Sequence, residues 1–330
     1  MKPFDNKLAA GLIALCALAA IPNCALSQPV ADYPSKPILL VIVYAPGGGL
    51  DVVGRIVAER LTRNLGRQVV VENRPGAGGN IGTASVAKTA AADGYTLLET
   101  TNSYNINPYI YKSTGYDAKK DFVPVIELTN APSVIITHPR SPYRSLKDVV
   151  NAARAEPGKL VYGSAGNGSP TNIAMEMFKM AANIDITHVP YKVATQANAD
   201  VMGGQTPLAM SALPSVITQI RAGLLHPVAV TSEKRWPTLP DVPSIAESGY
   251  PKFSHMTWIG ILVPAGTPAP IITRLNKEIA TVLANPEVRE RINAMGAEPV
   301  GKSAADFEAM LKTEYESTGK LAARIKMEEE

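Results

Sequence analysis

The chain alternates between two hydrophobic periodicities, and this alternation is the feature that most limits its fold. Residues 37–46 (PILLVIVYAP) form a nearly continuous apolar run typical of a buried strand, and residues 51–66 (DVVGRIVAERLTRNLG) place apolar side chains at helical spacing. Residues 68–75 (QVVVENRP) return to a strand pattern. Strands separated by helices are joined by crossover connections and lie parallel, so an α/β fold is predicted.

The alternation is interrupted once and then resumes. Residues 122–129 (FVPVIELT) and 132–139 (PSVIITHP) are predicted to form two consecutive strands with no helix between them, which is typical of a passage from one domain to another. A helix is expected again at residues 145–158 (SLKDVVNAARAEPG), and residues 256–266 (MTWIGILVPAG) are expected to form a strand that returns to the first domain. These breaks, near residues 130 and 256, predict two domains.

The N-terminus has the pattern of a secretory signal peptide. Lys2 and Lys7 precede an apolar run over residues 8–21, and a small-residue site (ALS) stands before Gln28. Residues 1–27 are therefore predicted to be removed, together with the only two cysteines of the chain. The mature protein is expected to be exported to a bacterial periplasm, without a disulfide or a lipid anchor.

Composition and motif searches exclude several classes of function. The formal net charge is +3, and no basic run with interleaved aromatic residues is present, so nucleic-acid binding is not indicated. The four histidines show neither an H-x-x-x-H nor an H-E-x-x-H spacing, and the chain has no G-x-S-x-G. No catalytic residue, metal ligand or cofactor is predicted, and an enzyme is not expected.

One apparent nucleotide motif is a coincidence of letters. Residues 296–303 (GAEPVGKS) fit the phosphate-loop pattern, but that loop requires a strand before it and a helix after it. The preceding residues have the pattern of an amphipathic helix, Gly296 suits the position after a helix C-terminus, and Ser303 with Asp306 suits the next helix start. A helix, a turn and a helix are therefore predicted, and Lys302 is expected to be incidental.

Two glycine-rich junctions between a strand and a helix are the candidate binding loops. We name residues 44–51 (YAPGGGLD) the first junction and residues 163–171 (GSAGNGSPT) the second junction. Glycines allow close backbone approach, and the free N–H groups at a helix start favour an anion, although such turns are often only tight turns. Asp51 is either a ligand contact or a favourable acid in the first turn of a helix. The candidate ligand-binding residues of the two junctions are Tyr44, Pro46, Gly47, Gly48, Gly49, Asp51, Ser164, Gly166, Asn167, Ser169 and Thr171.

Further polar residues follow the strand predicted around residues 96–101. Ser103 and Tyr104 stand at the end of this strand, where open α/β sheets bind ligands, and both are candidate ligand-binding residues. The alternative is that they close a turn before Asn107 and Pro108.

Long stretches of the chain resemble a known receptor family. The similar stretches include PGGGLD at residues 46–51, VVVENRPGAGGNIG at residues 69–82, GNGS at residues 166–169, HVPYK at residues 188–192 and AVTSEKRWPTLPDVPSIAESG at residues 229–249. On these stretches the chain resembles the extracytoplasmic solute receptors of tripartite tricarboxylate transporters, the Bordetella uptake gene (Bug) family. The similarity runs from Tyr33 almost to the C-terminus.

The resemblance implies a type II periplasmic binding fold. Two α/β lobes would be joined by crossing hinge strands, with the ligand cleft between them: residues 28–130 would form the first part of lobe 1, residues 131–255 lobe 2, and residues 256–330 the return to lobe 1. It also implies that residues 46–51 hold a ligand carboxylate, partly through backbone N–H groups and water. The implied ligands are small organic carboxylates such as di- and tricarboxylates or aromatic acids, and the implied partners are the membrane subunits of a tripartite transporter. The protein is expected to be a monomer.

Two departures from the family pattern bear on the ligand. Tyr191, a candidate ligand-binding residue, is followed by Lys192 and Val193 where the family often has Y-K-G. Ser211, another candidate, and Ala212 stand before Leu213 and Pro214 where the family often has an acidic or amide pair. The loss of a carboxylate there weakens the case for a ligand with an amino group. The aromatic residues that could offer a flat apolar surface to a ligand are Tyr44, Tyr104, Tyr191 and Trp258.

Three functions are compared on this basis. The leading hypothesis is a non-enzymatic periplasmic receptor that delivers one organic carboxylate to a membrane transporter. A receptor of the same fold that presents its ligand to a sensor histidine kinase is the second, and neighbouring genes for membrane subunits or for a kinase would discriminate between the two. An exported hydrolase is the third, which turnover of a bound carboxylate would favour.

Overall fold

Three parallel strands begin the described chain, as the alternating pattern predicts. The computed structural model describes residues 32–325, so the predicted signal peptide lies outside the described residues. The strand β1 (Ile38–Ile42) lies between β2 (Val69–Asn73) and β3 (Thr96–Thr101) and is parallel to both. The connecting helices are α2 (Gly49–Leu65) and α3 (Asn80–Thr89), the latter preceded by the short η2 (Ala77–Gly79).

The two strands expected at residues 122–129 and 132–139 are one continuous strand, so this prediction was wrong. The strand β4 (Phe122–Thr137) has 16 residues, and the chain changes its partners along it instead of turning. From Phe122 to Pro132 it pairs antiparallel with β9 (Met256–Pro264), and from Ser133 onward with β7 (Leu208–Ala212) and β8 (His226–Val230). The segment contains no glycine, and register shifts in its pairing with β9 accommodate the strand without a turn.

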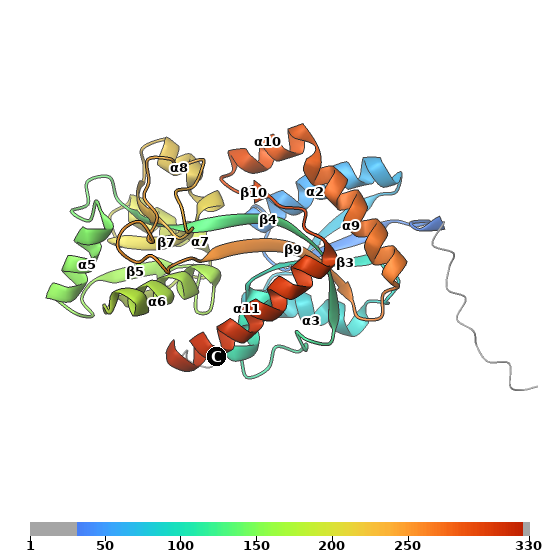
Figure 1. Cartoon of the computed structure of the whole chain (residues 1–330), viewed down its shortest axis with the longest axis horizontal. Helices are drawn as coiled ribbons and strands as arrows, with labels where there is room; N and C mark the ends of the chain where they lie inside the picture. The colour runs from blue at the N-terminus through green and yellow to red at the C-terminus, as the bar shows by residue number, and fades with distance from the viewer. Residues whose placement is uncertain (1–31, 326–330) are drawn as a thin grey trace, which may run out of the picture. The chain divides into compact units, whose positions relative to one another are not determined.

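A second group of parallel strands lies beyond β4. The strand β5 (Val161–Ser164) pairs in parallel with both β6 (Thr187–Pro190) and β7. The strand order is β2-β1-β3-β9-β4-β7-β5-β6, with β8 and the short β10 (Glu298–Pro299) paired to β4 (Figure 1). The helices of this part of the chain are α5 (Leu146–Ala155), α6 (Pro170–Ala182), α7 (Ala194–Met202) and α8 (Ile217–Arg221).

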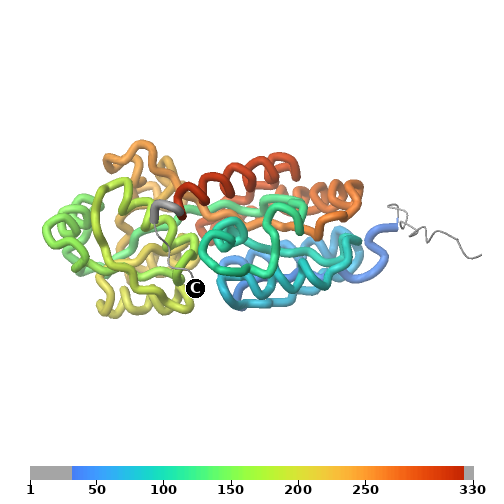
Figure 2. The backbone as a smooth tube through the Cα atoms, turned by 90° about the horizontal axis from the view of Figure 1, so that it is seen from below, coloured from blue at the N-terminus to red at the C-terminus, as the bar shows by residue number. Residues whose placement is uncertain are grey.

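The C-terminal helices return to the strands that begin the chain, and Figure 2 shows them in orange and red beside the blue segments. They are α9 (Ala269–Ala284), α10 (Pro286–Ala294) and α11 (Ala304–Ile325). Gly296 has a φ of 81°, and the Ser303 hydroxyl accepts a hydrogen bond of 3.1 Å from the Asp306 N–H. The predicted helices before and after GAEPVGKS are therefore confirmed, whereas the connection between them is not only a turn, because it contains the two-residue strand β10 paired to β4. The helix α10, and not a strand, leads into Gly296.

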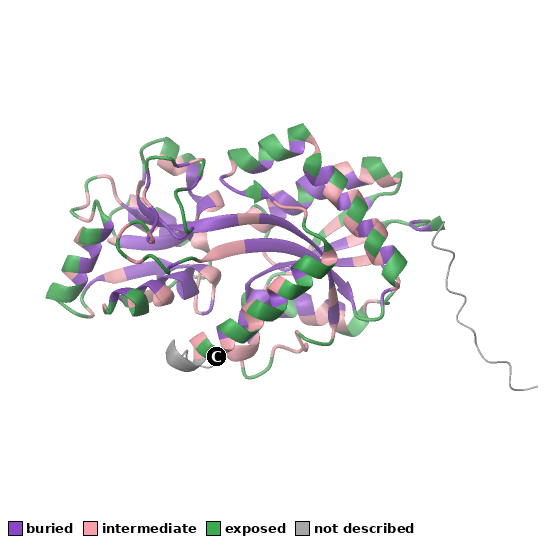
Figure 3. Cartoon of the chain, in the orientation of Figure 1, coloured by how far each residue is buried: buried purple, intermediate pink, exposed green. Residues whose placement is uncertain are grey.

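The strands are mostly buried and the helices expose their outward faces, as the purple and green of Figure 3 show. Most of the buried residues are apolar. One core cluster surrounds Tyr162 and Phe178 against α5 and α6, and another surrounds Leu98, Trp258 and Phe307 against α11. Among residues 32–325 no helix is long and apolar enough to cross a bilayer. The described residues from Pro34 onward group as one compact unit, and the division into lobes at residues 130 and 256 stays a prediction.

Candidate functional site

Both glycine-rich junctions lie at the carboxyl ends of parallel strands. The first junction follows β1 and the second follows β5, and parallel neighbours end at the same edge of a sheet. Each junction contacts the other group of strands and helices. A Cβ atom on Gly49 would lie 3.8 Å from the Cβ of Pro214, which follows β7, and one on Gly168 would overlap the side chain of Ile110. Each junction therefore lies close to residues from the other half of the sheet.

The first junction leaves backbone donors free. Gly47 has a φ of 82°, and its N–H donates 2.9 Å to Asp51 Oδ2. Gly48 is the N-cap of α2, with φ −78° and ψ 172°, and no side chain caps the helix. The next N–H groups, of Gly49 and Leu50, have no acceptor within the helix. Gly48 is exposed and Gly49 and Leu50 are half-buried, so the N–H groups at this helix start can bind an anion at the positive end of the α2 dipole.

Asp51 is bound by its own loop. Its side chain is almost fully buried, and its two oxygens accept from Arg55 Nε at 3.0 Å, from Asn73 Nδ2 at 2.9 Å and from the Gly47 N–H. Burial alone would raise the pKa of Asp51, but these three donors together lower it. The carboxylate thus shapes the first junction and has its charge compensated by Arg55. These contacts support the interpretation as a helix first-turn acid over direct ligand contact.

The second junction uses its donors internally. Gly166 and Gly168 have φ values of 109° and 66°. The Gly166 N–H donates 3.2 Å to Ser164 Oγ, and the Gly168 N–H donates 3.0 Å to Asn172 Oδ1. Two further bonds join Ala165 N–H to Thr171 Oγ1 at 3.2 Å and Asn172 N–H to Ser169 Oγ at 3.2 Å. Asn167 and Ser169 lie in this loop and are half-buried.

A third cluster of polar residues lies at the same sheet edge. The sequence predicted its members Tyr44 and Ser103 but not Asn80. Asn80, which begins α3, is 5 % exposed, and its Oδ1 accepts 2.7 Å from Asn107 Nδ2. Its Nδ2 and the buried Ser103 Oγ show no hydrogen-bond partner. Tyr44 lies beside them, with its hydroxyl donating 3.3 Å to the Gly78 carbonyl. The signal in the sequence is the glycine-rich stretch at residues 76–82, which stands at the end of β2 as the first junction stands at the end of β1.

Tyr104 and Trp258 do not offer a flat surface to a ligand, which corrects that expectation. Tyr104 is 2 % exposed, its ring stacks on Tyr116 at 5.5 Å, and its hydroxyl donates 2.8 Å to the Ala118 carbonyl. Trp258 is 3 % exposed and donates from Nε1 to the Glu314 carboxylate at 2.9 Å. Both rings belong to the apolar core and pack against neighbouring aromatic rings, so neither has surface left for a ligand.

Tyr191 directly follows β6, and Ser211 lies near the end of β7. The Tyr191 hydroxyl donates 2.6 Å to Asp200 Oδ2 and contacts Thr206, while its ring is half-buried. Ser211 is buried, and its hydroxyl donates 2.5 Å to Asn198 Oδ1. Both hydroxyls therefore have protein partners.

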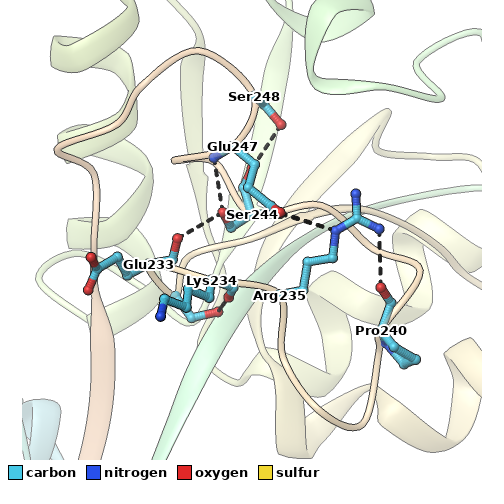
Figure 4. Close-up of polar contacts among 8 residues, drawn as sticks. Glu233, Lys234, Arg235, Pro240, Ser244, Glu247 and Ser248 are labelled. Atoms are coloured by element: carbon cyan, nitrogen blue, oxygen red, sulfur yellow. Dashed lines mark hydrogen bonds and ion pairs between the residues drawn. The ribbon is translucent and has the colours of Figure 1, made fainter.

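The stretch AVTSEKRWPTLPDVPSIAESG forms a loop that stabilises its own shape (Figure 4). Arg235 Nε lies 3.2 Å from Glu247 Oε2, which also accepts 2.9 Å from the Ser244 N–H. The Ser244 hydroxyl donates 3.1 Å to the Glu233 carbonyl, and Arg235 donates 3.2 Å to the Pro240 carbonyl. This long motif is structural, since its polar groups bind one another.

Lys302, the lysine that completes the phosphate-loop pattern, has a structural partner. Its Nζ lies 2.9 Å from Oε2 of Glu127, a β4 residue whose side chain is 1 % exposed. The lysine therefore places a positive charge next to a buried carboxylate.

Two surface hollows lie away from these residues. One of about 450 Å³ is bounded by residues 108–121, and one of about 650 Å³ by Arg221 and residues 286–294. Neither is lined by a predicted site residue. Within residues 32–325, no group of three or more His, Cys, Asp or Glu side chains is placed to hold a metal ion.

Comparison with known proteins decides the family. The family model described as "Tripartite tricarboxylate transporter family receptor" matches residues 53–327. The chain belongs to this receptor family. It is 36 % identical over 284 residues to the protein BugT of Bordetella pertussis, which covers 85 % of this chain and 87 % of BugT. The resemblance drawn from PGGGLD and the other stretches is thereby confirmed.

Solved structures of the receptor family have the same fold. Rpa4515 of R. palustris with adipate is 35 % identical with a TM-score of 0.82, covering 88 % of this chain and 99 % of that one. MatC from Rhodopseudomonas palustris with bound malate is 26 % identical with a TM-score of 0.80, covering 88 % and 100 %. The predicted α/β periplasmic binding fold is confirmed. Members of this family are solute-binding proteins and not enzymes.

Proposed function

We propose that this receptor captures a small organic carboxylate, a di- or tricarboxylate or an aromatic acid, and that the first junction is its anion anchor. The observation that carries the proposal is the set of free N–H groups from Gly48 to Leu50 at the start of α2, beside an Asp51 carboxylate whose charge Arg55 already compensates. A carboxylate accepting these N–H groups gains charge-assisted hydrogen bonds at the positive end of a helix.

The ligands of two relatives support this chemistry. Rpa4515 was solved with adipate and MatC with malate, and both are dicarboxylates. A dicarboxylate has two ends to hold, and the fold provides two junctions at facing strand ends. In this proposal the second junction, with Tyr191 and Ser211 near it, contacts the far end of the ligand. Asn80 supplies a polar contact beside the first junction, because its buried Nδ2 has no protein partner, and Ser103 supplies a second one beside Tyr44.

The proposed location is the periplasm, with delivery of the ligand to the membrane subunits of a tripartite transporter. The N-terminal signal pattern and the family description support both parts. The proposed lobes comprise residues 28–130 with 256–330, and residues 131–255, with β4 and β9 crossing between them. Residues 1–27 are proposed to be removed on export.

Identification of the bound solute tests this function. The protein is purified without added ligand and denatured, and the released small molecules are identified by mass spectrometry. Calorimetry then compares the identified acid, adipate and malate with their diamides. We expect a carboxylic acid to be released and the diamides to bind at least about tenfold more weakly, because they lose the charge-assisted bonds. A neutral solute, or diamides that bind as well as the acids, would contradict the proposal.

A further inference from the structure

A histidine missed as a functional candidate lies directly behind the second junction. His188 is in β6, opposite Tyr162 of β5, and its ring stacks on the Tyr162 ring with centroids 4.8 Å apart. Its Nε2 lies 2.7 Å from Ser164 Oγ, and its Nδ1 lies 3.4 Å from Asn172 Nδ2. Ser164 and Asn172 are the residues that hold Gly166 and Gly168, so His188 contacts both supports of the second junction.

The chain of hydrogen bonds behind this histidine has a fixed direction. Glu176 Oε1 accepts 2.9 Å from Lys179 Nζ, and as a carboxylate it has no hydrogen of its own to donate. The Tyr162 hydroxyl, 2.8 Å away, therefore donates to Glu176. Its oxygen is left to accept, and Asn172 Nδ2 donates to it at 2.7 Å.

The direction continues through Asn172 to the imidazole. With Nδ2 toward Tyr162, the amide oxygen Oδ1 accepts from the Gly168 N–H at 3.0 Å. The second hydrogen of Nδ2 then faces His188 Nδ1, which must be the unprotonated acceptor. A neutral imidazole carries one hydrogen, so it stands on Nε2 and is donated to Ser164 Oγ. The Ser164 hydroxyl accepts from His188 and from the Gly166 N–H, and its own hydrogen goes to the Gly166 carbonyl at 3.2 Å.

Protonation would break this order. A second hydrogen on Nδ1 would point at the Asn172 amino group, and relief would require Asn172 to turn away and release the Gly168 N–H. The groups that act on the charge of His188 are Glu176, which favours the imidazolium, and Lys179, which opposes it, both from α6. Burial is the larger influence and lowers the pKa of His188 to about 4, so the ring is neutral at neutral pH.

We propose that His188 is a positioning residue for ligand binding: its neutral Nε2–H form fixes Ser164 and, through Asn172, Gly168, and so sets the shape of the second junction. The inference rests on the proposed function in one respect, that the second junction contacts the ligand. Its structural part, the hydrogen on Nε2 and the dependence of the loop on it, does not require a ligand to be known.

Two variants separate hydrogen bonding from packing. His188→Phe keeps a ring to stack on Tyr162 but removes both nitrogens, and His188→Gln places an amide donor near the position of Nε2. Hydrogen exchange of the Gly166 and Gly168 amides is measured in the full chain. We expect exchange about three- to tenfold faster in His188→Phe, as for the loss of one hydrogen bond, and recovery toward wild type in His188→Gln. Adipate affinity, or malate affinity if adipate does not bind, is expected to follow the same order.

The decisive measurement is the tautomer of His188 by ¹⁵N NMR of the full chain at pH 7. We expect the Nε2–H form in the wild type and a shift toward the Nδ1–H form in Glu176→Gln, whose amide can donate to Tyr162 and reverse the chain. A wild-type ring that is charged or protonated on Nδ1, or Gly168 exchange unchanged in His188→Phe, would overturn the inference. If neither acid binds the wild type, the proposed ligand class fails, while the tautomer and exchange results still decide the role of His188.

Discussion

The two glycine-rich junctions begin at equivalent points of two parallel strand groups, yet they use their backbone N–H groups in opposite ways. In the first junction only the Gly47 N–H is bound, to Asp51, and the start of α2 has no side-chain cap. In the second junction the N–H groups of Ala165, Gly166 and Gly168 all donate to side chains of the same segment. The first is therefore suited to bind an anion through its backbone, and the second to present a rigid surface.

The difference comes from the polar residues that accompany the glycines. The second junction has Ser164, Ser169, Thr171 and the following Asn172, each with an oxygen that accepts from the loop. The first junction has Asp51 as its one such acceptor, and Arg55 and Asn73 share that carboxylate. Glycine content alone therefore does not identify an anion site. The number of side-chain oxygens within the loop decides whether backbone N–H groups remain free to bind an anion.

The largest expected effect is on the first junction. Gly48→Val should lower ligand affinity by at least about 2 kcal/mol, because a β-branched side chain would obstruct an anion at the helix start. The φ of Gly48 is −78°, so a side chain adds no backbone strain, and a Cβ there would meet only the Ala45 carbonyl, at 3.6 Å. The variant is therefore expected to keep its unfolding midpoint in urea. Calorimetry showing wild-type affinity would place the carboxylate at the second junction instead.

A glycine of the second junction should affect folding instead. Gly168 has a φ of 66°, and a Cβ there would overlap Ile110, so Gly168→Ala should lower the free energy of unfolding by about 1–2 kcal/mol. Urea unfolding measures this. The double variant with Ile110→Ala removes the overlap and leaves the backbone strain, which separates the two causes. A Gly168→Ala protein as stable as the wild type would show that the second junction is not rigid.

Loss of the Asp51 charge should loosen the first junction by a smaller amount. Asp51→Asn is expected to cost about 1 kcal/mol of stability at pH 7, since hydrogen bonds to a carboxylate are replaced by weaker ones. Because the folded-state pKa of Asp51 is lowered, its contribution is present above the unfolded pKa and disappears as the pH falls through the folded value. The wild type and the variant should therefore converge in acid. A double-mutant cycle with Arg55→Met isolates the ion pair, and a stability difference that persists at pH 2 would contradict this origin.

The smallest effect is expected in GAEPVGKS, the glycine stretch that belongs to neither junction. Lys302→Ala should lower the free energy of unfolding by about 0.5 kcal/mol, because its half-exposed ammonium faces the buried Glu127. Ligand affinity should be unchanged and no saturable binding of ATP should be detected in either protein. ATP binding that is lost with Lys302 would restore the phosphate-loop interpretation.

The sequence predicted most of the elements but not how β4 crosses the sheet. Periodicity and capping residues placed α10 and α11, because Gly296 and Ser303 act locally. The length of β4 depends on its partners, since β9, β7 and β8 follow it along its whole course. These partners lie far away in the sequence, from 71 positions for Thr137 and Leu208 to 142 for Phe122 and Pro264, and such pairing leaves no mark in a local pattern.

The sequence predicted the features of the candidate site that depend on local backbone conformation. It did not predict those that depend on which side chains meet in the folded protein. The first junction was found because consecutive glycines before a helix leave free N–H groups. The involvement of Asp51 with Arg55, the burial of Tyr104 against Tyr116, and the support of Ser164 by His188 all depend on tertiary neighbours. Asn80 was missed because an asparagine after a run of glycines suits a turn as well as a binding site.

The most direct test of the account is a crystal structure of the protein with the acid that it carries through purification. We expect a carboxylate oxygen within about 2.7–3.2 Å of at least two backbone nitrogens among Gly48, Gly49 and Leu50, directly or through one ordered water. We also expect the opposite end of the ligand to contact the second junction while the internal hydrogen bonds of that loop stay intact. A carboxylate bound at residues 164–171, with the start of α2 facing only solvent, would contradict it.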